Sequence, residues 1–420
     1  MKLPGQNKLH VRTCNGHSPL LFSTVIAVLG SSESFSMAVD IRAVRWDGST
    51  ITGQWDGSKD GVSLDFLGES GSVSDPLDDI SIVTFPVALR APAGPVAFHL
   101  HDGGVLFGKL NAGLPDAVQA ETAVGGATLG WDKLAAIRLA EPTQYKRAQE
   151  LFEEALLSRS PSQDALISRD HADVKVLQGR IESLDQNGGS FLFAGESRSF
   201  QLDKIYGIIF AAGATQPVPG NSTVELTDGS SISGTLKSAD KVSLHIKATF
   251  DASIEIPINN VRRMKFRSDR VEFLSDIKPS AQRIEGVLHD PWPVRYDRNV
   301  LENPLSIGGR SFERGLGLHS RTQLSYAIGG EFERFAATVG IDDAVRPLGS
   351  VVMQVIGDGK TLFDSGALSG VDPPRDILVD VSGVKTLTLL VDYGEGLDAS
   401  DHADWADARL LRPRKSTPKR

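Results

Sequence analysis

Side chains that could bind a ligand are concentrated near the C-terminal end of this chain. Between positions 392 and 407 the sequence brings together carboxylates, an imidazole and an indole: Asp392, Asp398, Asp401, His402, Asp404 and Trp405. Carboxylate oxygens are ligands that Ca²⁺ takes, about six to eight at a time with backbone carbonyls included. Their spacing differs from that of an EF-hand loop, so the sequence alone does not identify a metal site here.

Sugar binding is a second chemistry open to these side chains. A pyranose offers an apolar C–H face to an aromatic ring and hydroxyl groups to a few planar polar side chains. The aromatic candidates are Trp292 and Trp405, and the polar candidates are His319, Asp342 and His402. The structural alternative is that Trp405 packs in a core and that His319 makes a structural hydrogen bond. Asp343, Asp401 and Asp404 are further polar candidates, and their structural alternative is to cap turns.

Catalytic arrangements are not evident. The sequence contains neither Gly-x-Ser-x-Gly nor His-Glu-x-x-His. A glycosidase needs two carboxylates about 5–10 Å apart across a cleft, and the repeats described below occupy the length that a catalytic domain would need. We therefore predict that the protein is not an enzyme.

The composition limits the partners. The chain has 420 residues, with 44 Lys and Arg against 53 Asp and Glu and a net charge of −9. This acidic balance argues against nucleic acid, because phosphate binding needs a basic surface. The single cysteine, Cys14, excludes an intramolecular disulfide framework and Cys-based zinc clusters.

Residues 1–38 have the order of an export signal. Basic residues precede an apolar run from Leu20 to Leu29, and Ser36-Met37-Ala38 provides a small-x-small cleavage site. The run is too short to cross a hydrocarbon core about 30 Å thick. We expect a secreted, periplasmic or cell-envelope protein with no transmembrane span in the mature chain.

A four-fold repeat fills the middle of the chain. The segments 47–53, 102–108 and 228–234 all read Asp-Gly-x4-Gly, and the segment 173–179 keeps the Asp and the second Gly. An apolar strand closes each copy at nearly the same distance from its second Gly, at Ile80–Phe85, Leu134–Leu139, Ile205–Phe210 and Val261–Phe266. Such regularity indicates repeated structural units.

Each unit predicts a small curled sheet. Asp-Gly after an apolar strand predicts a type I′ hairpin turn, and a Gly inside the second strand indicates a sharp bend or bulge. We interpret the units as SH3-like barrels of about five strands, and their strand pattern resembles the Sm-like barrel. They lack a basic, aromatic-lined stripe for RNA, so we expect spacers or protein-contact modules.

One helical stretch separates the second and third copies. Residues 142–158 place Tyr145, Ala148 and Phe152 on one face at helical spacing. We therefore expect the repeats to associate as two pairs in sequence order, the first with the second and the third with the fourth.

The predicted organisation is all-β apart from this connector. The ranges are a signal peptide at 1–38, repeats at 40–88 and 94–140, a helical connector at 141–160, repeats at 164–212 and 221–268, a β-sandwich at 270–412 and a basic tail at 413–420. Short alternating strands and Gly-rich turns, including the Asp358-Gly359 hairpin, support the sandwich.

Several segments of the sandwich resemble the NPCBM family, a carbohydrate-binding module first recognised beside family 98 glycoside hydrolases. The matching segments are Gly308–Phe312, Arg314–Ser320, Phe335–Asp343, Gly349–Val352, Gly357–Lys360, Leu362–Ser365, Val379–Gly383 and Asp401–Asp407. Leu318 stands where the family often has Thr or Val, and Val287–Arg295 is a looser match. The resemblance covers about a third of the chain.

This resemblance implies a galactose-binding-like jelly roll that binds glycans. It also implies a structural Ca²⁺, for which Asp392, Asp398, Asp401 and Asp404 are the candidate ligands. We expect a non-catalytic protein that binds an extracellular or cell-surface glycan, with envelope proteins or a separate hydrolase as further partners. The alternative is a structural or protein-interaction role in the envelope with no sugar affinity, and an exposed Trp beside convergent polar groups would favour the first interpretation.

Overall fold

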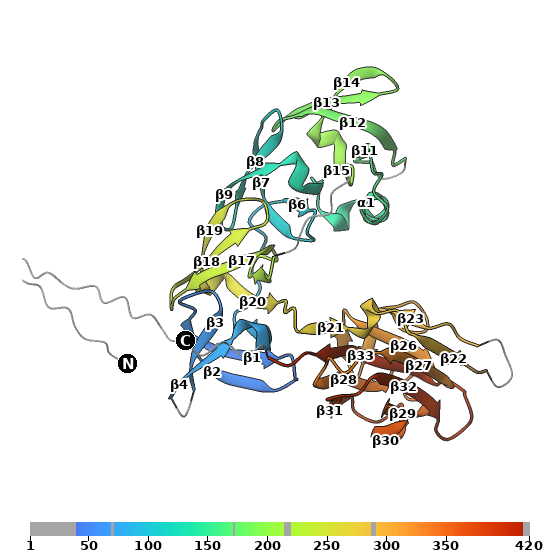
Figure 1. Cartoon of the computed structure of the whole chain (residues 1–420). Helices are drawn as coiled ribbons and strands as arrows, with labels where there is room; N and C mark the ends of the chain where they lie inside the picture. Colours follow the sequence, from blue (N-terminus) through green and yellow to red (C-terminus); the bar gives the residue numbers. More distant parts are fainter. Residues whose placement is uncertain (1–38, 69–70, 171–172, 214–219, 287–290, 415–420) are drawn as a thin grey trace, which may run out of the picture. The chain divides into compact units, whose positions relative to one another are not determined.

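The computed structural model describes residues 39–68, 71–170, 173–213, 220–286 and 291–414. Strands dominate, and one α-helix, α1 (Lys146–Leu157), interrupts them (Figure 1). The predicted all-β fold class is confirmed. The expected signal peptide and positions 415–420 of the expected basic tail lie outside the described residues. Within the described ranges, no helix has the length and apolar character needed to span a membrane.

Five strands fall in each of the four predicted repeat ranges. The first holds β1 (Asp40–Arg45), β2 (Thr50–Gly57), β3 (Ser63–Gly68), β4 (Gly71–Pro76) and β5 (Ile80–Thr84). The second holds β6 (Val96–Leu100), β7 (Val105–Gly113), β8 (Ala117–Thr122), β9 (Gly125–Gly130) and β10 (Leu134–Arg138). The third holds β11 (Asp164–Ser168), β12 (Val176–Leu184), β13 (Gly188–Phe193), β14 (Glu196–Gln201) and β15 (Ile205–Ile209). The fourth holds β16 (Ser222–Leu226), β17 (Ser231–Ala239), β18 (Ser243–Ala248), β19 (Ser253–Pro257) and β20 (Val261–Phe266).

All four units share one strand pairing. In each, the first four strands pair in order, and the fifth returns to pair with the first, as β5 does with β1. The same pattern recurs in the second unit, the third and the fourth. A short 3-10 turn precedes each fifth strand, at Leu77–Asp79, Trp131–Lys133, Leu202–Lys204 and Ile258–Asn260.

The glycine in each second strand is required by a close backbone approach. A Cβ at Gly108, Gly179 or Gly234 would lie 2.2–2.4 Å from a carbonyl oxygen of the third strand, and at Gly53 it would lie 2.9 Å away. Only glycine permits the second strand to bend this closely over the third. The repeated Gly of the sequence therefore sets the curvature of each unit.

The Asp-Gly turns differ from the predicted type. Only the glycines have positive φ, at 86–87° for Gly48, Gly103 and Gly229. The aspartate side chain instead accepts a hydrogen bond from the backbone N–H two residues ahead, as Asp47 Oδ1 does from Ser49 at 2.8 Å. The predicted type I′ turn is therefore wrong: the loop is a three-residue hairpin ending in a left-handed glycine.

The expected pairing of the repeats is also wrong. The fifth strand of the first unit pairs antiparallel with that of the fourth, with Val83 opposite Met264. Likewise β10 of the second unit pairs with β15 of the third, with Ile137 opposite Ile208. In both cases the fourth residue of one strand faces the fourth residue of its equivalent, which is a two-fold arrangement of like strands.

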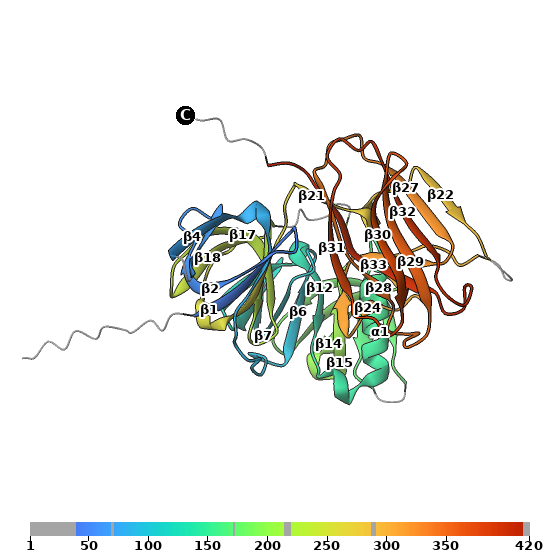
Figure 2. The same cartoon turned by 90° about the horizontal axis from the view of Figure 1, so that it is seen from below.

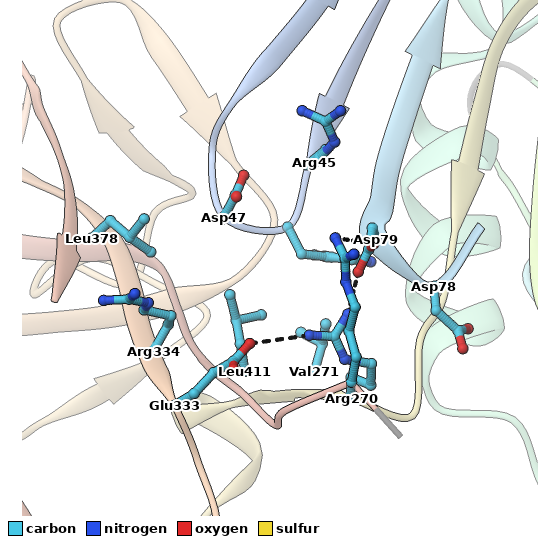
Figure 3. A pocket seen from close by; sticks show the side chains of 12 residues that line it. Arg45, Asp47, Asp78, Asp79, Arg270, Val271, Glu333, Arg334, Leu378 and Leu411 are labelled. Carbon is cyan, nitrogen blue, oxygen red and sulfur yellow. Dashed lines mark hydrogen bonds and ion pairs between the residues drawn. The ribbon is translucent and has the colours of Figure 1, made fainter. Parts of the chain in front are cut away.

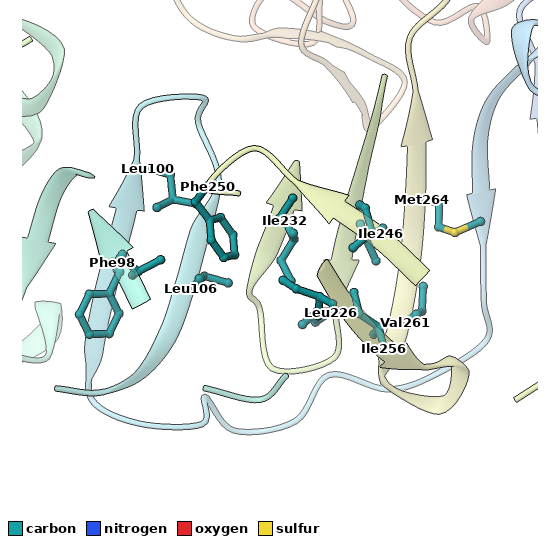
Figure 4. Packing of buried hydrophobic residues seen from close by; sticks show 14 of the residues in the cluster. Phe98, Leu100, Leu106, Leu226, Ile232, Ile246, Phe250, Ile256, Val261 and Met264 are labelled. Atoms are coloured by element: carbon teal, nitrogen blue, oxygen red, sulfur yellow. The ribbon is translucent and has the colours of Figure 1, made fainter. Parts of the chain in front are cut away.

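The helical connector packs on the second and third units. Phe152 of α1 is buried, its ring lies 5.8 Å from that of Tyr206, and a Cβ at Gly207 would meet it at 2.5 Å. The predicted helical connector is present. Figure 4 shows how the second and fourth units fill their interiors with apolar side chains, including Phe98, Leu106, Ile232 and Ile256.

The remaining strands form a sandwich of two antiparallel sheets (Figure 2). One sheet contains β21 (Val271–Phe273), β23 (Arg295–Tyr296), β26 (Gly315–His319), β28 (Arg334–Ile341), β31 (Arg375–Asp380) and β33 (His402–Leu411). The other contains β22 (Ala281–Ile284), β27 (Thr322–Ala327), β29 (Ser350–Gly357), β30 (Lys360–Ser369) and β32 (Thr386–Tyr393). A small hairpin, β24 (Leu305–Ile307) and β25 (Arg310–Phe312), completes the domain.

The sandwich core is built from alternating residues of both sheets. Leu316, Val339 and Trp405 of the first sheet share a buried cluster with Leu324 and Leu389 of the second. The predicted Asp358-Gly359 hairpin is confirmed, with φ values of 47° and 81° that suit a type I′ turn. The β-sandwich predicted for the C-terminal third is therefore present.

We predict that Gly234→Ala destabilises the repeats by about 1–3 kcal/mol, the usual cost of overpacking. The added Cβ would lie 2.4 Å from the Lys247 carbonyl oxygen. Gly126→Ala is the matched control, because a Cβ there meets nothing within 4 Å. Scanning calorimetry should show a lower unfolding temperature for the repeats in Gly234→Ala alone, and equal effects of the two substitutions would contradict the role assigned to this glycine.

Candidate functional site

Three aromatic rings meet at one end of the sandwich. The ring centroids of Trp292 and His319 are 5.7 Å apart and nearly parallel, with an interplanar angle of 25°. His402 lies 5.4 Å from both, tilted to Trp292 and edge-on to His319. The structure therefore brings together three of the five predicted binding residues, and we call Trp292, His319 and His402 the aromatic triad.

Strand register places these rings together. His319, the last residue of β26, lies directly opposite His402, the first residue of β33. Pairing of β23 with β26 puts Arg295 opposite Gly317, so the chain just before β23 runs past His319. Trp292 stands there between Pro291 and Pro293, whose rings restrict the backbone. Trp292 is half-buried, so the residue keeps part of its surface in contact with solvent.

The two imidazoles are largely buried. His319 is 3% exposed and His402 is 7% exposed, and His319 Nδ1 lies 2.6 Å from the Ser320 carbonyl oxygen. Burial lowers the pKa of His402 and the neighbouring His319 adds to this effect, while the carboxylate of Asp342 opposes it. His402 is therefore neutral at physiological pH, with one ring nitrogen able to accept and the other able to donate a hydrogen bond.

The triad lies on the outer face of its sheet. Side chains alternate along a strand, so His402 and Asp404 point away from the core that receives Ala403 and Trp405. Gly317 and Gly340 lie opposite Asp404 on the two neighbouring strands. With no side chains there, the segment 298–307 packs close to the sheet: a Cβ at Gly340 would meet Ile307 at 2.5 Å.

Asp342 is a buried residue that stabilises this face of the sheet. It is 1% exposed and accepts hydrogen bonds from Asn299 Nδ2 at 2.9 Å and from the Ala344 N–H at 2.8 Å. Its own N–H donates to the His402 carbonyl oxygen at 2.9 Å. Asp342 therefore lies behind the triad and positions it, rather than facing a ligand directly. Asp343 points elsewhere and accepts hydrogen bonds from Ser306, Gly308 and Gly309, so the two consecutive aspartates do not act as a pair.

Asp401 connects the two sheets beneath the triad. Its Oδ2 accepts from the Ser320 hydroxyl at 2.6 Å, and its Oδ1 accepts from the Ser350 N–H at 2.9 Å. Burial raises the pKa of Asp401 to about 6, and the nearby charge of Asp398 adds to this, although both hydrogen bonds act in the opposite direction. Asp401 thus fixes the position of Ser320, which follows His319, relative to Ser350 at the start of β29.

The four candidate calcium ligands do not form one coordination sphere. Asp392 is paired with the Arg321 guanidinium, 3.4 Å away. Burial, followed by the neighbouring Asp342, raises the pKa of Asp404 well above its usual value. Asp398 lies near Asp401, and both Asp401 oxygens already accept hydrogen bonds. Within the ranges that the structure describes, no cluster of three or more His, Cys, Asp or Glu side chains fits a metal; calcium stays a prediction from the resemblance.

Trp405 is a core residue. Its side chain is fully buried and its ring lies 6.1 Å from that of Phe335. Trp405 therefore packs in the core, as its structural alternative predicted, and its indole does not reach solvent. Ser320, Ser350 and Asn299 were not identified from the sequence; only Ser320 had a signal, as the neighbour of His319.

A separate cavity of about 310 Å³ is lined by residues that include Arg45, Asp79, Arg270 and Glu333 (Figure 3). Several of its charged side chains form ion pairs within the fold: Arg270 is paired with Asp79 and Glu333, and Arg45 with Asp75 at 2.7 Å. None of the triad residues lines it.

The raised pKa of Asp401 predicts a pH-dependent stability. In the unfolded chain this carboxyl titrates near 3.8 and in the folded chain near 6. Its contribution is therefore fully present below pH 3.8 and is lost as the pH rises to 6. Asp401→Asn should remove up to about 3 kcal/mol of this pH dependence, measured as the difference from wild type in chemical unfolding between pH 4 and pH 7.

Ser320→Ala provides the companion variant for this measurement. It removes a hydrogen bond that stabilises the Asp401 carboxylate, so the midpoint of the dependence should move to higher pH. An unchanged pH profile in both variants would show that Asp401 ionises normally.

Comparison with known proteins supports the assignment of the sandwich. Residues 270–411 match the family model of the NPCBM/NEW2 domain. A stretch of 108 residues is 33% identical to a putative endo-alpha-N-acetylgalactosaminidase of Renibacterium salmoninarum, covering 26% of this chain and 7% of that protein. A stretch of 118 residues is 29% identical to alpha-1,3-galactosidase B of Akkermansia muciniphila, covering 27% of this chain and 15% of that protein.

Solved structures of carbohydrate-binding modules are also similar. A CBM51 module of Clostridium perfringens GH95, solved in complex with methyl-galactose, is 24% identical and matches 34% of this chain and 99% of its own, with a TM-score of 0.31. The chain spans only a small part of the length of the curated relatives it matches. The C-terminal third of this chain, residues 270–411, belongs to the NPCBM/NEW2 domain family.

Proposed function

We propose that the chain is a non-catalytic, exported glycan-binding protein whose ligand contacts the aromatic triad. The observation that carries this proposal is a half-exposed Trp292 held against two buried imidazoles. An indole face offers stacking to the C–H surface of a pyranose, and the neutral His402 imidazole offers a donor and an acceptor to its hydroxyls. This combination of one apolar platform and a few fixed polar groups is the usual composition of a sugar site.

Support for the glycan class comes from the NPCBM/NEW2 match and from the relatives. Both curated relatives are named as enzymes that act on α-linked galactose or N-acetylgalactosamine. Glycans ending in these sugars are therefore the first probes. The repeats would present the module, and the catalytic step would belong to a separate hydrolase. The carboxyl pair nearest the triad, Asp342 and Asp404, is buried, so it does not face a substrate as a catalytic pair would.

Glycan-array binding of the chain, followed by calorimetric titration, tests this proposal. Trp292→Ala should reduce affinity by about five- to thirtyfold, because stacking of one aromatic ring contributes about 1–2 kcal/mol. Its fold should be retained, since Trp292 lies outside the sandwich core. Tyr296→Ala, which changes another exposed aromatic residue on the same segment, is the matched control and should bind normally.

Trp405→Ala should instead unfold the sandwich, because loss of a fully buried Trp costs about 3–5 kcal/mol. Circular dichroism separates the two effects. Absence of glycan binding by a folded wild-type chain would overturn the proposal and favour a structural or protein-interaction role.

A further inference from the structure

The four repeats share a free sheet edge. In each unit the fourth strand pairs with the third, and no pairing of its other side is found among the described residues: β4, β9, β14 and β19 all have one partner. The fifth strands, by contrast, are paired on both sides. An exposed edge of unpaired N–H and C=O groups is a template for another strand, and proteins usually block it with charge or proline.

Three of these edges are blocked and one is not. β4 ends in Asp75-Pro76, β14 carries Glu196 and Arg198, and β19 carries Glu255 and Pro257. β9 reads Gly-Gly-Ala-Thr-Leu-Gly, with no charge and no proline. All four strands occupy the same place in the same fold. Among them, β9 is the strand that lacks a charged residue or a proline.

The geometry shows which groups β9 offers. The Trp131 N–H, directly after the strand, donates to the Asp116 carbonyl oxygen beside β8 at 2.8 Å. Alternation along an antiparallel strand then directs the backbone groups of Gly126, Thr128 and Gly130 away from β8. Gly126 and Thr128 are exposed, so these donors and acceptors are open to a partner strand.

We propose that two copies of this chain associate through β9, in an antiparallel pair centred on Thr128. Thr128 then lies opposite its own equivalent and Ala127 opposite Leu129, so the residues that face the interior of the unit stay on one side of the joined sheet. No like charges meet, because β9 has none. The chain already uses this association twice, where β5 meets β20 and β10 meets β15 in two-fold register.

Analytical ultracentrifugation of the full chain over a range of concentrations tests this interface. Wild type should form dimers, and Thr128→Pro should weaken dimerisation by at least about tenfold. The monomer tolerates proline there because the Thr128 N–H points outward, where an edge strand accepts it. Ser199→Pro is the matched control, because Ser199 occupies the corresponding position of β14, opposite Ser190, and should leave dimerisation unchanged.

Cross-linking locates the same contact independently. In a Cys14→Ser background the chain has no cysteine, so Thr128→Cys should form an intermolecular disulfide on mild oxidation, since directly paired residues lie at about 5.5 Å between Cα atoms. Ser199→Cys should not. Thr128→Glu, which places like charges opposite each other, should give monomers if the proline variant misfolds. A wild type that stays monomeric, a dimer unaffected by every substitution at 128, or binding only of an unrelated extended peptide would each overturn the proposal.

Discussion

The pairing of β26 with β33 is the constraint on which the candidate site depends. It sets His319 opposite His402 and, two residues further along each strand, Gly317 opposite Asp404. Because side chains alternate along a strand, the same register sends Trp405 into the core and keeps the imidazoles on the outer face. A slip of one residue would bury the histidines and expose the indole. The position of the core Trp and that of the triad are thus fixed by a single register.

Buried polar groups maintain this register at the rim. Asp342 connects the segment after β28 to Asn299 and to the backbone of His402, and Asp401 connects Ser320 to Ser350 across the two sheets. Buried carboxylates of this kind are costly unless their oxygens accept hydrogen bonds, and they then favour one geometry over its alternatives. The consequence is that the backbone at His402 and next to His319 is fixed before a ligand binds, which lowers the entropy cost of binding.

The sequence predicted the parts of this fold that depend on local pattern. Closing strands, the helical connector, the sandwich strands and the bend glycines follow from periodicity and from the special conformations of glycine. The partner of each fifth strand could not be predicted, because Val83 and Ile137 are equally apolar and nothing local distinguishes Met264 from Ile208 as a neighbour. At the site, the alternation in His402-Ala-Asp404-Trp405 already separates the indole from the imidazole. The meeting of Trp292 with His319 depends on long-range register, and the hydrogen bond from Asn299 to Asp342 had no sequence signal.

The repeat architecture could compensate for a small glycan-binding site by increasing the number of sites in one assembly. A single indole and two imidazoles offer a small contact area, so affinity for one sugar residue is expected to be weak. Two-fold use of the fifth strands joins the units in pairs and, among the repeat strands that the structure describes, leaves the fourth strands open at their edges. Of these, β9 alone lacks a charge or proline that would prevent association. A dimer formed there carries two sandwiches, and the second glycan contact becomes intramolecular, which raises the avidity for a multivalent surface without any new contact to the sugar.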